Sequence, residues 1–199
     1  MTAFSQPVLL AVSQIKDFER FLKSSLDTCI LMDLHINLLP GMIRSAHSAG
    51  KRVFLHADLL RGVSADEFGC EYICQQLRAD GVISTKTRIL ETARRNGAAI
   101  ILRLFLIDTK SLEKGLNLIQ GLRPDCVELL PGLACEVIPR LKKRMASMDM
   151  KEVSFLCGGL IRTPEQIRRC LDAGACAVTL SDGTLAAKYL EKYLRNEKP

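Results

Sequence analysis

Two adjacent glycines follow a short apolar run in the sequence Cys157-Gly158-Gly159-Leu160-Ile161-Arg162-Thr163. Because glycine has no side chain, such a pair lets backbone N–H groups approach an anion closely. A second stretch, Leu180-Ser181-Asp182-Gly183, offers a hydroxyl and further N–H groups at the start of a helical segment. Gly158, Gly159 and Ser181 are therefore candidates to hold a phosphate group. The alternative is that both glycines only form a tight turn.

Two arginines accompany apolar segments and need an explanation. Arg162 follows the glycine pair, so it either binds the same phosphate or is a surface residue ahead of the helix cap Thr163. Arg103 ends a strongly apolar run, where an unpaired guanidinium would be unfavourable. It is expected either to contact a ligand or to form a buried ion pair with a carboxylate such as Glu128.

Asp33, His35, His56 and Asp58 follow or end two neighbouring apolar runs. These residue types can ligate a metal or transfer protons. They can also bond to one another as a structural network, or contact a ligand. Ligand contact or structural hydrogen bonding is favoured here, and neither a metal nor another cofactor is expected.

Motifs typical of enzymes are missing from the sequence. No lysine ends an apolar run, as a Schiff-base aldolase of the usual barrel type would require, and Lys86 comes nearest. The sequence contains no Gly-x-Ser-x-Gly, His-Glu-x-x-His or Walker motif. The polar residues therefore indicate recognition more than catalysis.

The elements that must position these residues are short apolar runs, each followed by a segment of helical periodicity. The predicted strands are Val8–Val12, Thr28–Asp33, Arg52–His56, Gly81–Ser84, Ala98–Arg103, Cys126–Leu130, Val153–Cys157 and Ala177–Leu180. Apolar strands alternating with helices predict a parallel sheet covered by helices. Eight units favour a single (β/α)8 TIM-barrel-like domain over residues 1–199. An open doubly wound sheet is the alternative, but no dinucleotide fingerprint follows the first strand.

Composition agrees with one globular protein. Hydrophobic residues make up 48% and charged residues 25%, which excludes disordered and fibrous classes. No apolar run reaches the length of a membrane span, and no signal peptide is recognised, so the cytoplasm is the expected location. The eight cysteines lack the paired spacing of zinc sites and are expected to be reduced thiols.

Five ordered motifs carry a family resemblance. They are His56-Ala57-Asp58-Leu59-Leu60-Arg61-Gly62, Gly81-Val82-Ile83-Ser84-Thr85-Lys86, Arg103-Leu104-Phe105-Leu106-Ile107-Asp108, Glu128-Leu129-Leu130-Pro131-Gly132 and Gly158-Gly159-Leu160-Ile161-Arg162-Thr163. With this series, the chain from about Val8 to Leu194 resembles the glycerol uptake operon antiterminator regulatory proteins (GlpP).

The resemblance implies a regulator rather than an enzyme. Glycerol 3-phosphate would be the effector, the leader of glycerol-operon messenger RNA the target, and transcription antitermination the outcome. It implies a phosphate site on Gly158, Gly159 and Ser181. The residues implied around or beside the glycerol portion are Asp33, His56, Asp58, Arg103, Glu128 and Arg162.

The sequence gives weaker evidence for a surface that would bind RNA than for the phosphate site. The basic candidates are Arg140, Lys142, Lys143, Arg144, Lys188 and Lys192. They can bind RNA phosphates, or they are the solvated faces of helices. Aromatic residues, which stack on unpaired bases, are only 5% of the chain, although Tyr189 and Tyr193 lie beside the second basic group.

Two functions of different class follow from the sequence. The first is the effector-dependent RNA regulator, and self-association of this protein is left open. The second is a small barrel enzyme, such as an isomerase, a lyase or a phosphodiesterase, acting on a phosphorylated small molecule. The regulator is preferred.

Overall fold

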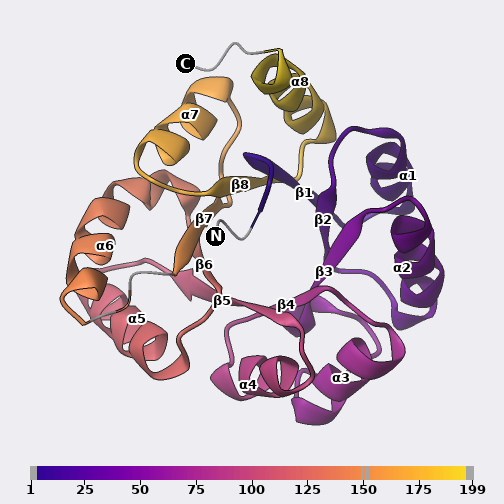
Figure 1. The fold of residues 1–199 in the computed structure, drawn as a ribbon, viewed down its shortest axis with the longest axis horizontal. Helices are drawn as coiled ribbons and strands as arrows, with labels where there is room; N and C mark the ends of the chain where they lie inside the picture. Colours follow the sequence, from indigo (N-terminus) through magenta and orange to yellow (C-terminus); the bar gives the residue numbers. More distant parts are fainter. Residues whose placement is uncertain (1–3, 149, 151–152, 196–199) are drawn as a thin grey trace.

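A computed structural model describes residues 4–148, 150 and 153–195 of the chain. Its eight parallel strands close into a barrel in the order β1 to β8, with each strand hydrogen-bonded to its neighbours in sequence and β8 paired with β1. Figure 1 shows the helices as an outer ring around these strands. The predicted (β/α)8 barrel is confirmed. The strands are β1 Val8–Val12, β2 Thr28–Leu31, β3 Arg52–His56, β4 Gly81–Ser84, β5 Ala99–Phe105, β6 Cys126–Leu130, β7 Ser154–Gly158 and β8 Ala177–Leu180.

One helix or helical pair follows each strand. The α-helices are α1 Ile15–Lys23, α2 Leu39–Ser48, α3 Glu67–Glu71, α4 Thr87–Arg95, α5 Thr109–Leu122, α6 Ile138–Ala146, α7 Pro164–Asp172 and α8 Gly183–Leu194. Short 3₁₀ segments are η1 Ile36–Leu38, η2 Ala57–Leu59 and η4 Gly132–Val137, and α3 continues into a π-helical turn, η3 Tyr72–Gln76. The predicted start of α7 is confirmed, because Thr163 caps it and forms a capping box with Gln166.

Two predicted strand ends are wrong in ways that matter for the site. β2 ends at Leu31, and Asp33 lies beyond it in a left-handed conformation with φ of 56°. β5 continues past Arg103 to Phe105 because its pairing with β6 continues, with Phe105 opposite Leu130. Arg103 is therefore inside a strand rather than at its end.

Alternate residues of the strands fill the barrel in layers. The lower layers are apolar and include Leu9, Ile30, Phe54, Ile83, Ile101, Cys126, Leu156 and Ala177. Two residues further along four of these strands the inward positions hold His56, Arg103, Glu128 and Thr179, with Gly158 on a fifth strand. The interior therefore changes from apolar to polar toward the carboxyl ends of the strands.

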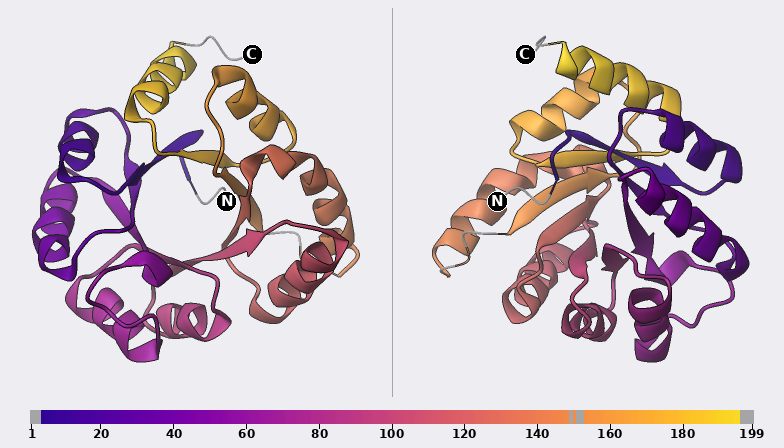
Figure 2. Two further views of the ribbon diagram at one scale, coloured as in Figure 1. Left: turned by 180° about the vertical axis from the view of Figure 1, so that it is seen from behind. Right: turned by 45° about the vertical axis from the view of Figure 1, so that its right-hand side comes forward.

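The amino ends of the strands are closed by the chain itself. Phe4 is buried against Phe54, with ring centroids 5.3 Å apart, and residues 4–7 run from the start of β1 toward the ring of strands (Figure 2). The buried Gln6 side chain donates to the Val8 carbonyl at 2.7 Å and accepts from the Asp27 N–H at 2.7 Å. This end of the barrel is packed and hydrogen-bonded.

The cysteines and helices agree with a globular interior. All eight cysteines are free, six of them buried and two half-buried. Burial raises the pKa of the Cys29 thiol well above its ordinary value. Within the described residues, no helix combines the length and apolar character that crossing a membrane requires.

Candidate ligand-binding site

A buried ion pair crosses the upper part of the barrel. Arg103 Nε donates to Glu128 Oε2 at 2.7 Å, and the two side chains are 13% and 1% exposed. The hydroxyl of Thr179 donates to the other oxygen, Glu128 Oε1, at 3.0 Å. Of the two roles expected for Arg103, the structure contains the ion pair. The pair uses Nε, and the terminal nitrogens of the guanidinium carry its other donors.

The two glycines at the end of β7, Gly158 in the strand and Gly159 after it, have different roles. A Cβ at Gly158 would lie 2.4 Å from Thr179 Oγ1 and 2.7 Å from Glu128 Oε1, so no side chain fits there. Gly159 is exposed and has φ of 76°, and the following Leu160 is also left-handed, with φ of 62°. Glycine thus gives room to the buried Glu128 at one position and allows a left-handed turn at the next.

The loop after β8 lies beside the glycines because Gly158 is paired with Thr179. Ser181 is exposed in this loop and available to a ligand. Asp182 Oδ1 accepts from the N–H groups of Thr184 and Leu185, at 2.9 and 3.0 Å. The expectation that the start of this helix offers free N–H groups is therefore wrong for these two, because a carboxylate of the chain already caps them.

His56 is the unusual residue of the polar layer. It ends β3, is 1% exposed, and neither ring nitrogen has a hydrogen-bond partner within the described residues. Burial, followed by the charge of Arg103, lowers its pKa to about 4. The imidazole is therefore neutral near pH 7 and carries one donor and one acceptor. Since buried polar groups are normally hydrogen-bonded, an unpaired one inside a barrel mouth points to a polar ligand.

Of the alternatives left open for Asp33, His35, His56 and Asp58, the Asp–His hydrogen-bond network does not form among the described residues. Asp58 instead accepts from Ser84 Oγ and from the Thr85 N–H, both at 2.7 Å, so it joins the loops after β3 and β4. His35 is exposed and accepts from the Asn37 N–H at 3.3 Å. Asp33 is half-buried, and its N–H donates to the Leu59 carbonyl. Among the described residues, no three His, Cys, Asp or Glu side chains gather as metal ligands.

The remaining predicted residues lie outside the polar layer. Arg162 is exposed on the rim, where its N–H donates to Gln166 Oε1 at 2.7 Å within the cap of α7. On α6, Lys142 donates to the Gly174 carbonyl at 2.6 Å, and Arg144 pairs with Glu113. The other basic candidates, Arg140, Lys143, Lys188 and Lys192, are exposed.

The tyrosines beside the α8 basic residues are not free for stacking. Tyr189 and Tyr193 are half-buried and pack against the hydrophobic core between barrel and helices. Burial also raises the pKa of Tyr189. Their four-residue spacing therefore belongs to the buried face of α8.

Known proteins resemble this chain over nearly its whole length. Residues 8–185 match the family described as glycerol-3-phosphate responsive antiterminator. The uncharacterized protein YgcP of Escherichia coli (strain K12) is 29% identical over 187 residues, which cover 92% of this chain and 95% of YgcP.

Two solved structures are also similar. The glycerol uptake operon antiterminator regulatory protein from Listeria monocytogenes str. 4b F2365 is 33% identical, with a TM-score of 0.83, over 92% of this chain and 95% of that one. A glycerol uptake operon antiterminator-related protein from Thermotoga maritima MSB8 is 26% identical, with a TM-score of 0.76, over 90% and 97%. The chain belongs to the family of glycerol-3-phosphate responsive antiterminators.

Proposed function

We propose that this protein binds glycerol 3-phosphate in the mouth of its barrel and, in response, binds the leader of a glycerol-operon messenger RNA to prevent transcription termination. Membership of the antiterminator family supports the regulatory role. The observation that carries the ligand site is the buried His56, which has no hydrogen-bond partner in the part of the chain that the structure describes and lies in the same layer as the Arg103–Glu128 pair. These groups supply a donor, an acceptor and charge for a small polar ligand.

The two ends of the effector would bind to different parts of the mouth. The phosphate would lie against the turn at Gly158 and Gly159 and accept from the Ser181 hydroxyl, with Arg162 on the rim. The glycerol hydroxyls would reach down to His56, Arg103 and Glu128. Asp58, with its bonds to Ser84 and Thr85, and Asp33 would hold the surrounding loops.

The same contacts give little support to the enzyme alternative. Both oxygens of Glu128 are already bonded, to Arg103 and to Thr179, so the carboxylate has a structural role in the polar layer. Lys86, the lysine nearest to a strand end, donates to the Ala65 carbonyl at 2.7 Å on the surface. We therefore propose binding without turnover.

Calorimetric titration tests the ligand. We expect glycerol 3-phosphate to bind with at least tenfold higher affinity than glycerol or inorganic phosphate, because only the phosphoester reaches both parts of the mouth. Phosphorus NMR of the mixture should show unchanged ligand after prolonged incubation. Equal affinity for the three compounds would overturn the proposed site, and a product resonance would favour the enzyme.

Gly159→Val tests the position of the phosphate. Left-handed backbone at a non-glycine residue is unfavourable by about 1–3 kcal/mol, so the variant should be less stable and lose glycerol 3-phosphate binding at least tenfold. Gly97→Val is the matched control, since Gly97 has a nearly equal φ of 78° and open space around its Cβ position. The control should lose similar stability in urea and keep its affinity. Equal affinities in both variants would exclude the proposed phosphate position.

A further inference from the structure

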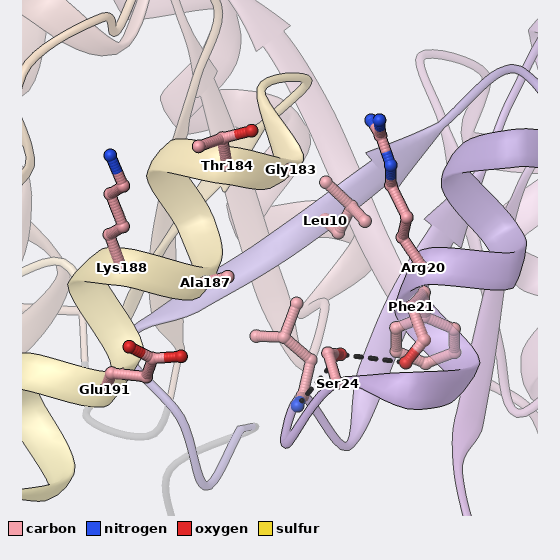
Figure 3. Close-up of a pocket in the computed structure, with 10 residues that line it drawn as sticks. Leu10, Arg20, Phe21, Ser24, Gly183, Thr184, Ala187, Lys188 and Glu191 are labelled. Carbon is pink, nitrogen blue, oxygen red and sulfur yellow. Dashed lines mark hydrogen bonds between the residues drawn. The ribbon is translucent and has the colours of Figure 1, made fainter.

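A groove separates α1 from α8 on the outside of the barrel (Figure 3). Its volume is about 280 Å³, and its floor is formed by the apolar side chains of Leu10, Phe21 and Leu26. Arg20 lies along the α1 side and Lys188 along the α8 side, so a cation borders the groove on each wall. The groove is thus apolar at its base and positively charged at its edges.

Each wall belongs to a longer row of basic residues. On α1, Lys16, Arg20 and Lys23 are four and three residues apart, and all are exposed. At α8, Lys188, Lys192 and Arg195 repeat this spacing and are also exposed. Residues with this spacing share one face of a helix. Because Arg20 and Lys188 both line the groove, the two rows border it.

Carboxylates and hydroxyls complete the lining. Arg20 pairs with Asp17 at 3.3 Å, with its own side chain 57% exposed, and Glu191 lies on the α8 wall. Exposed pairs of this kind are weak and exchange readily for another anion. Thr184 contributes an exposed hydroxyl group from the α8 wall, whereas the Ser24 hydroxyl on the α1 wall already donates to the Phe21 carbonyl at 2.8 Å and accepts from the Leu26 N–H at 3.2 Å. The groove can therefore bind an anionic chain that also carries hydroxyls.

We infer that the groove between α1 and α8 binds a single-stranded segment of RNA along its sugar–phosphate backbone, an inference that rests on the proposed function. The phosphates would pair with the two basic rows, while the apolar base of the groove accepts a ribose or the edge of a base. The basic residues of α6, Arg140, Lys142, Lys143 and Arg144, form the alternative RNA surface. They lie on a single helix, and Lys142 and Arg144 bind Gly174 and Glu113, whereas the groove offers cations on two facing walls. The α1 row was missed in the sequence, although its spacing is visible there.

The groove also adjoins the proposed effector site. Gly183 and Thr184 form its end nearest the barrel mouth, directly after Ser181 and Asp182. Gly183 packs on the floor, since its Cβ position lies 3.7 Å from Leu10 Cδ1. The cap that Asp182 provides to α8 joins the same loop to the helix wall. A ligand held by Ser181 thus shares one loop with the RNA groove.

The test compares two double variants of equal charge change. Arg20→Ser/Lys188→Ser removes one cation from each wall, and Arg140→Ser/Lys143→Ser removes two exposed cations from α6. A fluorescein-labelled leader transcript of a glycerol-utilisation operon is titrated by anisotropy at several salt concentrations, with saturating glycerol 3-phosphate. We expect at least tenfold weaker binding for the groove variant and a log–log salt slope smaller by about 1.4, that is, two phosphate contacts. The α6 variant should stay within about twofold of the wild type.

Other outcomes separate the failure of the groove from the failure of the function. Loss of affinity in the α6 variant alone would place the RNA on that face and overturn the groove. Equal losses in both variants would indicate unlocalised charge attraction and would also overturn it. If the wild type does not bind the transcript at all, the proposed function fails and the groove proposal fails with it. Calorimetry should show unchanged glycerol 3-phosphate affinity in the groove variant, which confirms that it is folded.

Discussion

The two ends of the barrel differ in whether a buried polar side chain has hydrogen-bond partners. At the amino ends of the strands, the buried Gln6 makes hydrogen bonds with Val8, Asp27 and Thr28, and Asp80 and Asp125 accept from the N–H groups of Val53 and Ile100. At the carboxyl ends, the equally buried His56 makes none within the described residues. Satisfied polar groups stabilise a fold, whereas an unsatisfied one is tolerated where a ligand completes it. The comparison assigns ligand binding to the carboxyl end, where His56 is left for a ligand, and support of the fold alone to the amino end.

Breaking the Arg103–Glu128 pair should have the largest effect on stability. Glu128→Ala leaves a largely buried guanidinium without its carboxylate, for which we expect a loss of about 3–5 kcal/mol in urea unfolding. The double variant Arg103→Leu/Glu128→Leu removes both charges and should recover most of this loss. It should still fail to bind glycerol 3-phosphate, and normal binding would show that the pair only supports the fold.

A substitution at the opposite end should separate stability from binding. Phe4→Ala removes the aromatic ring that packs on Phe54, and buried Phe→Ala changes lower stability by about 3–5 kcal/mol. Affinity for glycerol 3-phosphate should not change at a temperature where the variant is folded. A parallel loss of affinity would contradict the division between the two ends.

His56 should make the carboxyl end sensitive to acid. Its pKa is lowered to about 4 in the folded protein, so the unfolded chain binds the proton more tightly between the two pKa values. The stability due to neutral His56 is full above about pH 6.5 and is lost as the pH falls toward 4, on the order of 2–3 kcal/mol.

The comparison variant for this titration is His56→Leu, measured by urea unfolding from pH 7 to pH 4. The difference in stability between wild type and variant should shift in favour of the variant as the pH falls. A constant difference would mean that the His56 pKa is not lowered by folding.

Much of the fold could be predicted because it depends on local patterns. The apolar runs and the cap at Thr163 are visible in the sequence, and both define elements of the barrel. The end of β5 was missed because pairing with β6, rather than local composition, extends the strand to Phe105. Where a strand ends because of its pairing with a neighbouring strand, the residues of that segment alone do not predict the end.

The candidate site could be predicted in its composition but not in its bonding. Glu128 was expected as a partner of Arg103, and the ion pair is present. For Asp58 the sequence left ligand contact and a hydrogen bond to histidine open, but the register of β3 and β4 places Ser84 and Thr85 against it. Which polar side chain remains unpaired depends on the closed barrel, so the isolation of His56 could not be foreseen.

The segment from Ser181 to Thr184, which joins the end of β8 to the first turn of α8, has a thermodynamic consequence. It connects the proposed effector site with the groove between α1 and α8, and any coupling between two binding equilibria is reciprocal. If glycerol 3-phosphate strengthens RNA binding by some factor, a bound transcript strengthens glycerol 3-phosphate binding by the same factor. A newly made leader would then lower the effector concentration needed for its own readthrough, so the response threshold would depend on how much leader the cell is making.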